Sequence, residues 1–521
     1  MKNSGVQSVL AYHDRSKHRL GRYAPGPGFM DWDNQPDPFL RYKGARTQPF
    51  LKVPIDEPAA SLPLDAHGLS RLFFDSLALS AWKSYQGKAW PLRVNPSSGN
   101  LHPTEGYLIS GPVPGLLEQA SVCHYSPLEH ALEIRAEIPV ELWQKISSST
   151  PDGSVFIGLS SIHWREAWKY GERAFRYCQH DVGHAIEAIG TSARALGWRA
   201  KLMDGLSTAD LVALLGLSGP RTDEENEEPE CLLLITPDGA ADPGEVLSPE
   251  TVTAFQKLAW SGIPSPLSAA HESWPAIDEA ALASRKERTP ELTTESGVGE
   301  SHPRKIIHQR RSAVDFDGTT AMSQDSFYRI LSKVQGPSEV IPWKPEVHLA
   351  IFVHRVTGLD PGLYFLIRNP AQASELRESM KPGFHWKKPE GCPSDLEFFQ
   401  LVAGDARQAA KAISCGQDIA ADGCFSLGMI AHFEAPLRER GAWFYRRLFW
   451  ECGMIGQTMY LEAESAGVRA TGIGCFFDDE MHEILGLTGL RYQSLYHFTV
   501  GGPVEDARLT TLPGYPDLAR G

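Results

Sequence analysis

The sequence of 521 residues contains few cysteines, and no two of them are spaced as a CxxC pair. Eight cysteines scattered in this way disfavour a disulfide framework or a zinc site, so we expect buried, reduced thiols and no bound metal. No run of about 18 apolar residues occurs, and no apolar segment typical of a signal peptide follows the first residues. We therefore expect a cytoplasmic protein that does not enter a membrane.

An excess of basic residues is also missing. The chain has 50 Lys and Arg against 64 Asp and Glu, which gives a net charge of −14. Nucleic acids and anionic membranes require a basic face that replaces their counterions, so neither is an expected partner. An anionic ligand would have to meet a local cluster of arginines. The length fits two to four domains, and the 42% of hydrophobic residues can fill ordinary cores.

The sequence contains an internal repeat, and corresponding positions of its two copies are 270 residues apart. The positions that carry the same residue in both copies are Gly171, Arg176, Gly183, Ala193, Gly197, Arg199, Ala200 and Leu215 to Leu217, matched by Gly441, Arg446, Gly453, Ala463, Gly467, Arg469, Ala470 and Leu485 to Leu487. No insertion interrupts this register. We infer an internal duplication.

Each copy is predicted to form a long helix that is mostly buried. Apolar residues recur at spacings of three and four, and Gly197 and Gly467 follow as C-caps. Small residues such as Gly183 and Gly453 would let another backbone come close. The alternative is a duplicated core hairpin that carries no chemistry.

Composition divides the chain into four parts. Residues 1–60 are polar and proline-rich, and we expect a short helix, with His13 and His18 on a solvated face, followed by an arm. The first repeat spans 61–260, a linker spans 261–304 and the second repeat spans 305–521. Within the second repeat, a helix is predicted near 418–434.

Two motifs of the second repeat suit an anion. Arg310, Arg311 and Ser312 offer two guanidinium groups and a hydroxyl that could bind a phosphate, and Arg508 could add a third cation after the last strand. Gly472, Ile473 and Gly474 form a turn whose amides could approach a flat ring or an anion. Taken singly, the arginines have an alternative explanation as surface charges. The glycine motif has one as a plain turn between a helix and a strand.

A loop of the first repeat offers different groups. Pro96, Ser97, Ser98, Gly99 and Asn100 supply hydroxyls, amides and a carboxamide from a rigid turn. Such groups can bind the polar edge of a heteroaromatic ring. The alternative is an ordinary loop.

Together these motifs resemble the flavin-dependent nitroreductase superfamily. Residues 10–260 and 305–510 carry most of the resemblance, and the segments near Tyr12, Arg93, Trp168 and Gly358 are similar to its SagB type, which includes azoline oxidases of modified peptides. The resemblance implies an α+β fold in which two nitroreductase-like α/β sandwich repeats pack as an intramolecular pseudo-dimer. It also implies FMN bound at the interface between the repeats.

The motifs are divided between the repeats. The second repeat has the arginine and glycine elements, but it has Gln335 to Glu339 where the serine-rich loop is expected. The first repeat has the loop and lacks the arginines. The resemblance therefore implies one composite FMN site per chain and a degenerate second site. Because the interface lies within one chain, we expect a monomer, with further dimerisation left open.

Lys169 and Tyr170 match the pair that azoline oxidases of this branch use to remove a proton. When a C–C bond is dehydrogenated, a hydride passes to the flavin and a nearby base takes the proton. An ammonium beside the Tyr170 phenol would make the phenol easier to ionise. The alternative is a packed tyrosine beside a lysine whose ammonium reaches solvent. The second repeat has Glu439 and Arg440 at these positions.

The expected function is an FMN-dependent oxidoreductase that passes a hydride between flavin and a small-molecule or peptide substrate, with azoline dehydrogenation as the example given by the resemblance. One alternative is an NAD(P)H-dependent reductase of nitro or quinone compounds. The other is a flavin-less scaffold or peptide-binding module. The chain has no GxGxxG unit, but nitroreductases do not need one, so this absence does not separate the alternatives.

Overall fold

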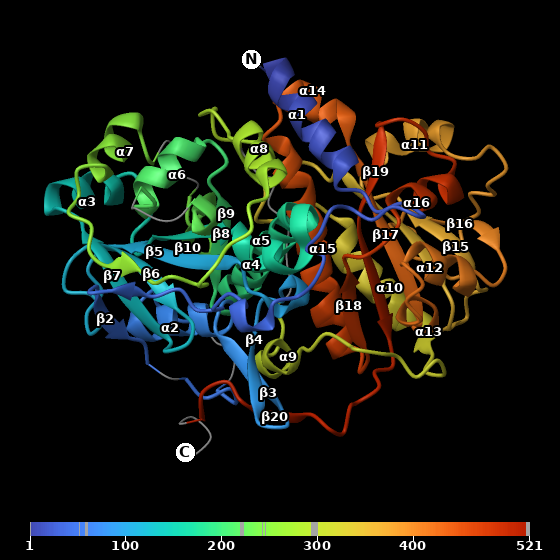
Figure 1. Cartoon of the computed structure of the whole chain (residues 1–521), viewed down its shortest axis with the longest axis horizontal. Coiled ribbons are helices and arrows are strands. Elements are labelled where there is room, and N and C mark those ends of the chain that lie inside the picture. Colours follow the sequence, from blue (N-terminus) through green and yellow to red (C-terminus); the bar gives the residue numbers. More distant parts are fainter. Residues whose placement is uncertain are drawn as a thin grey trace.

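The computed structural model describes residues 2–51, 53–57, 61–218, 223–241, 243–244, 246–292 and 301–516. Two antiparallel sheets lie on opposite sides of a central pair of helices (Figure 1). The central helices are α5 (Ala174–Ala195) and α15 (Phe444–Ser465). Both bounds of α15 lie 270 positions after those of α5, as the sequence register predicts.

The sheet on the left of Figure 1 belongs to the first half of the chain and has the order β2-β7-β6-β5-β8-β10-β9. Its strands are β2 (Arg46–Pro49), β5 (Thr104–Ser110), β6 (Ser121–Ser126), β7 (Ala131–Glu137), β8 (Val155–Ile162), β9 (Trp198–Leu202) and β10 (Glu227–Pro237). Its helices are α2 (Ala66–Phe74), α3 (Val140–Ser147), α4 (His163–Tyr170), α6 (Thr208–Leu215) and α7 (Pro249–Phe255).

The sheet on the right has the order β16-β15-β13-β17-β19-β18. Its strands are β13 (Val347–Val353), β15 (Gly362–Leu366), β16 (Phe398–Ala403), β17 (Phe425–His432), β18 (Arg469–Ile473) and β19 (Tyr492–Gly501). The helices of this half are α9 (Arg304–Gln309), α10 (Gln324–Gln335), α11 (Ala373–Ser379), α12 (Arg407–Ile413), α13 (Ile419–Asp422), α14 (Glu434–Arg440) and α16 (Asp478–Leu485).

Three smaller sheets tie distant segments together. The hairpin β3 (Leu79–Tyr85) and β4 (Lys88–Arg93) is joined by β20 (Thr510–Pro513) from the C-terminal segment. The short strands β1 (Tyr42–Lys43) and β11 (Ile263–Pro264) pair, and so do β12 (Met322–Ser323) and β14 (Val356–Thr357). The C-terminal segment thus crosses from the right half to the left half, as Figure 1 shows.

The central helices are in backbone contact. A Cβ atom on Gly453 would lie 2.9 Å from the Cα of Gly183 and would overlap the carbonyl oxygen of His180. A Cβ on Gly183 would overlap the carbonyl of Trp450. Since Gly183 and Gly453 are also 270 positions apart, equivalent residues meet at the centre of the interface, as in a symmetric dimer.

Residues 418–434 were predicted as one helix, and this prediction is wrong. The segment forms the four-residue helix α13 and then β17, which pairs with both β13 and β19. A central strand covered on both faces is apolar throughout, so it shows no alternation that would distinguish it from a buried helix.

The N-terminal helix α1 (Lys2–Arg15) lies beside α8 (Pro275–Ala283) and α14 at the top of Figure 1. His13 was predicted on a solvated face, but its side chain is fully buried between α5 and the second half. It contacts the Tyr445 hydroxyl, Gln493 and the guanidinium of Arg176. The polar sequence of α1 concealed this contact because its partners lie far away in the chain.

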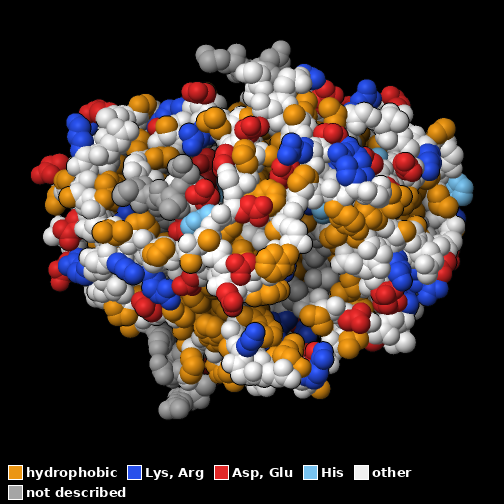
Figure 2. Space-filling model, viewed as in Figure 1, with side chains coloured by type: hydrophobic (Ala, Val, Ile, Leu, Met, Phe, Trp, Pro, Cys, Tyr) orange, Lys and Arg blue, Asp and Glu red, His pale blue; other side chains and the backbone are white. Residues whose placement is uncertain are grey.

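No helix in the described part of the chain is long and apolar enough to cross a membrane. On the face shown in Figure 2, basic and acidic side chains are interspersed.

Candidate functional site

A cavity of about 550 Å³ lies between the two halves, next to the central helices. It lies within the size range of small-molecule and cofactor sites. The predicted residues that line it are Pro96, Ser97, Ser98, Gly99, Asn100, Tyr170, Arg310, Arg311, Ser312, Gly472, Ile473 and Gly474. The fold therefore brings together the loop of the first half and both motifs of the second half.

The serine-rich loop is fixed on α5. The backbone amide of Ser98 donates to both carboxylate oxygens of Asp181, and the Ser98 hydroxyl donates to one of them at 3.0 Å. Gly99 has a left-handed backbone (φ 58°), and a Cβ there would overlap the hydroxyl of Tyr170. Glycine is thus required on two grounds, its conformation and the closeness of Tyr170.

Arg310 and Arg311 follow α9 and are held by backbone carbonyls. Arg310 is 4% exposed, donates to the carbonyls of Arg93 and Val94, and lies over the ring of Tyr460. Burial lowers the pKa of both arginines, and the neighbouring Arg310 charge further lowers that of Arg311, to about 10. An anion in the cavity would offset this repulsion and the cost of burying two charges.

Ser312 joins the arginine motif to the glycine turn. Its hydroxyl lies 2.8 Å from the Tyr460 hydroxyl, which accepts from the amide of Gly472 at 3.1 Å. The amide of Ala313 donates to the carbonyl of Ala470 on β18. Two segments about 160 residues apart in sequence are therefore held side by side at the cavity wall.

Arg508 does not line the cavity. Its side chain is 74% exposed and pairs with Asp506 at 2.8 Å. Lys83 on β3 lines the cavity instead, and Leu509 does so directly after Arg508. The sequence pattern placed a cation after the last strand, but the chain there turns toward β20 and directs the guanidinium outward.

Lys169 also lies outside the cavity lining, although its ammonium is 5.3 Å from the centre of the Tyr170 ring. Burial is the main cause that raises the pKa of Tyr170 well above its usual value, and Glu166 adds to it. The phenol therefore holds its proton at neutral pH, which differs from the expected ease of ionisation. In this environment the Tyr170 hydroxyl can donate a hydrogen bond to a group in the cavity.

Two buried carboxyl groups beside the loop were not predicted. Burial raises the pKa of Asp181 to about 7, even though its hydrogen bonds to Ser97 and Ser98 oppose the shift. Burial also raises the pKa of Glu166 well above its usual value, and the nearby Asp181 adds to it. Among the described residues, the Oε2 atom of Glu166 has no hydrogen-bond partner. Carboxyl groups of this kind can exchange protons near neutral pH.

His184 is a further residue that the sequence did not reveal as part of the site. It lines the cavity one turn after Asp181 on α5, and its Nε2 atom lies 3.4 Å from the Tyr496 hydroxyl. Burial, together with the charge of Arg310, lowers its pKa to about 3. The sequence signal for Asp181 and His184 was limited to the presence of two polar residues within the apolar pattern of the repeated helix.

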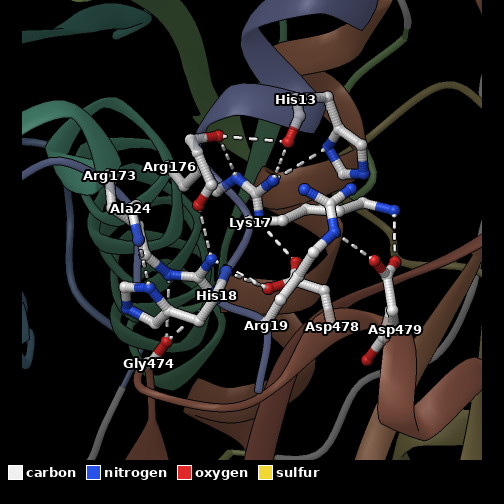
Figure 3. A network of polar contacts seen from close by, with 12 residues as sticks. His13, Lys17, His18, Arg19, Ala24, Arg173, Arg176, Gly474, Asp478 and Asp479 are labelled. Atoms are coloured by element: carbon white, nitrogen blue, oxygen red, sulfur yellow. Dashed lines mark hydrogen bonds and ion pairs between the residues drawn. The ribbon is translucent and has the colours of Figure 1, made fainter. Parts of the chain in front are cut away.

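The glycine turn is positioned by charged residues from both halves, shown in Figure 3. Arg173 donates to the carbonyl of Gly474 at 3.1 Å and pairs with Asp478 at 3.0 Å, while Arg176 pairs with Asp478 at 2.7 Å. Burial alone would raise the pKa of Asp478, but the two guanidinium groups lower it to about 2. The carboxylate remains charged and holds the turn at the wall of the cavity.

A second cavity of about 310 Å³ lies on the other side of the central helices. Its lining includes Gly336 to Glu339, the counterpart of the serine-rich loop, and Glu451, which is 270 positions after Asp181. Its arginines are paired with acids: Arg194 contacts Glu187 at 2.6 Å, and Arg368 contacts Glu451. This cavity is the counterpart of the first in the 270-residue register, but its charged groups are arranged differently.

Comparisons with known families and solved structures show what the chain resembles. Residues 391–502 match the model of the nitroreductase family. The structure of a putative nitroreductase from Anabaena variabilis superimposes with a TM-score of 0.70 and 21% sequence identity, covering 95% of this chain and 99% of that one. The chain therefore has a nitroreductase-like α+β fold along nearly its whole length, as the sequence predicts.

Other solved structures resemble only part of the chain. A putative nitroreductase from Ralstonia eutropha covers 41% of this chain and 90% of its own, with a TM-score of 0.28 and 16% identity. A microcin synthetase complex of Escherichia coli with a truncated precursor bound covers 46% and 95%, with a TM-score of 0.27 and 16% identity. No curated protein matches the sequence. The comparisons thus show a nitroreductase family match within the second half and a nitroreductase-like fold for the chain as a whole.

Proposed function

We propose that this protein is an FMN-dependent dehydrogenase with one flavin site per chain, formed in the cavity by both halves. The observation that carries this proposal is the meeting of the serine-rich loop, the arginine pair and the glycine turn in one cavity. A duplication that left each repeat with half of the binding groups explains why one composite site would remain.

The residues of the cavity fit the chemistry of FMN. Arg310, Arg311 and the Ser312 hydroxyl offer cationic and neutral donors for a phosphate, and their lowered arginine pKa values favour a bound anion. Ser97, Ser98 and Asn100 offer polar groups for the edge of the ring. When bound, the flavin would supply the hydride acceptor that no side chain provides.

The remaining task of the chain is to move a proton. Tyr170, next to Gly99 of the serine-rich loop, keeps its proton. Asp181, which accepts hydrogen bonds from Ser98 of that loop, changes protonation near pH 7. We propose that the protonated Tyr170 donates a hydrogen bond that positions the substrate, with Lys169 setting the charge beside it. The Asp181 carboxylate, which lines the cavity, accepts the proton that the substrate loses, and Glu166 is the next group on its route out.

The substrate belongs to a class that loses a hydride and a proton from adjacent atoms, as azoline rings of modified peptides do. This assignment rests on the SagB-type resemblance of the segments around Arg93, Trp168 and Gly358. A peptide-borne or free heterocycle is therefore the first class to test, before nitro compounds and quinones.

The experiment is to purify the full chain, record its visible spectrum and titrate it with FMN while phosphate is quantified. We expect about one FMN per chain. Two flavins would refute the composite site, and no binding after reconstitution would favour a scaffold role.

A further inference from the structure

Two cysteines meet at the wall of the cavity. Cys475 directly follows the glycine turn and lines the cavity. Cys415 lies in the turn between α12 and α13, close enough to Cys475 for each thiol to shift the pKa of the other. Both side chains are half-buried, whereas five of the remaining six cysteines are buried.

The segments that carry these thiols are fastened together. The amide of Phe477 donates to the carbonyl of Ile413 at 2.7 Å, and the Gln417 side chain donates to the carbonyl of Cys475 at 2.9 Å. Cys415 itself has a left-handed backbone (φ 55°), which is unusual for a residue other than glycine. Strained positions of this kind concentrate at functional sites.

After Cys415, His18 is the next group that lowers the pKa of Cys475. Its Nδ1 atom accepts from the amide of Ala24 at 2.9 Å, an arrangement visible in Figure 3. Burial lowers the pKa of His18, so the ring is neutral and its proton lies on Nε2. That N–H is the group left to act on the sulfur of Cys475, whose pKa His18 helps to lower.

The neighbouring Cys415 thiol contributes most to the shift, and with His18 and the charge of Arg173 it lowers the pKa of Cys475 to about 5. The pKa of Cys415 is raised in turn. The titratable groups that face this pair of thiols are His18, Tyr23, Tyr170, Tyr177 and Arg173. A thiolate beside a resolving thiol, reachable from a cavity, is the arrangement of redox-active cysteines.

We propose that Cys415 and Cys475 form a redox-active pair that exchanges two electrons with the flavin of the adjacent cavity: the dithiol closes into a disulfide when it would reduce the flavin, and the disulfide would take two electrons back from flavin that the substrate has reduced. The bond that forms joins the two sulfur atoms. The Cys475 thiolate and the Cys415 thiol together lose one proton and two electrons, and the flavin becomes reduced. The choice of acceptor rests on the proposed function; the reactivity of the pair does not.

The dithiol itself is tested on the full-length chain without flavin. The protein is equilibrated in mixtures of reduced and oxidised dithiothreitol, quenched with acid and alkylated, and its peptides are mapped by mass spectrometry. We expect a disulfide between Cys415 and Cys475, which is lost in Cys415→Ser and Cys475→Ser. Cys392→Ser is the matched control, because Cys392 is a half-buried thiol outside the cavity lining. Both thiols remaining free in the oxidising mixtures would overturn the proposal.

The role of His18 is tested by alkylation rates. At pH 6 we expect iodoacetamide to modify Cys475 at least about tenfold faster than Cys392, because only Cys475 is largely a thiolate. His18→Phe removes the Nε2–H donor and should bring the two rates closer together, with the circular dichroism spectrum unchanged. Equal rates in the unaltered protein would contradict the proposal.

The acceptor is tested last, with FMN bound and oxygen excluded. Reduced dithiothreitol should bleach the visible absorption of the flavin in the unaltered protein and in Cys392→Ser, and on the order of tenfold more slowly in Cys475→Ser. Equal bleaching in all variants would refute electron transfer from the pair to the flavin. A chain that closes the disulfide but binds no FMN would refute the proposed function and leave the redox pair standing.

Discussion

Gly183 and Gly453 face each other where α5 and α15 cross, so that a Cβ on Gly453 would lie 2.9 Å from the Cα of Gly183. The two positions are related by the 270-residue register, and the cavity lies next to these helices. The distance between the helices therefore sets the spacing between the serine-rich loop of one half and the arginine pair of the other.

Gly453→Ala should destabilise the protein strongly. The added methyl group would meet backbone atoms of α5, which cannot move aside as a side chain can. We expect a loss of about 3 kcal/mol in the free energy of unfolding, despite the higher helix propensity of alanine. Urea denaturation measures the change. Gly190→Ala, on α5, is the control: its methyl group would meet only side-chain atoms, of Val340 at 2.8 Å and Arg194 at 3.5 Å, and a smaller effect is expected.

Arg310 and Arg311 should determine flavin affinity. Each charge-assisted hydrogen bond to a phosphate contributes roughly 1.5 to 3 kcal/mol, so replacing either arginine by alanine should raise the Kd for FMN on the order of 10- to 100-fold. Because Arg310 also holds the carbonyls of Arg93 and Val94, its variant needs a parallel stability measurement. Arg508→Ala should leave the affinity unchanged. A large loss in that variant would restore Arg508 to the phosphate site.

Tyr170→Phe and Lys169→Ala should separate chemistry from binding. Neither residue belongs to the arginine cluster, so FMN should remain bound. The rate of substrate dehydrogenation should fall on the order of 10² to 10⁴-fold if these residues serve the proton transfer. Single-turnover reduction of the flavin by an identified substrate is the measurement. Unchanged rates in both variants would make the pair structural.

Asp181 should make stability depend on pH. Its pKa of about 7 in the folded chain lies above that of an unfolded aspartate, so the folded state binds the additional proton. The stability that this proton contributes is complete at low pH and is lost as the pH rises through about 4 to 7. Asp181→Asn removes this dependence and should gain stability relative to the parent as the pH is raised, on the order of 2 kcal/mol at pH 8.

Thermal unfolding of both proteins at pH 5 and pH 8 measures that difference. Asp210→Asn is a contrasting variant, because hydrogen bonds from Ser207 and Arg288 outweigh burial and lower the pKa of Asp210. Its carboxylate stabilises the fold above the unfolded pKa. Parallel behaviour of the two variants would show that Asp181 is not the group responsible.

The chain should be a compact monomer, because the central helices already bury the interface that two separate subunits would share. Light scattering combined with small-angle X-ray scattering measures mass and shape. Two lobes that move independently about residues 261–304 would refute the internal pseudo-dimer.

The sequence by itself determined the main helices and the grouping of the motifs. Apolar spacing and the 270-residue register predicted α5 and α15, since a buried helix needs a continuous stripe whatever its partner is. The glycines at 183 and 453 indicated close packing. The loop at 96–100 and the motifs at 310–312 and 472–474 were recognisable because turn chemistry and charge are local properties.

Only the tertiary structure decided what surrounds these groups. Asp181 looked like one polar residue in a helix, but its burial raises its pKa against the opposing hydrogen bonds from Ser97 and Ser98. His18 lines the cavity through contacts across most of the chain, and Arg508 is directed away from it because the chain turns toward β20. Proton affinity and proximity depend on neighbours that are distant in sequence, and local patterns contain no record of them.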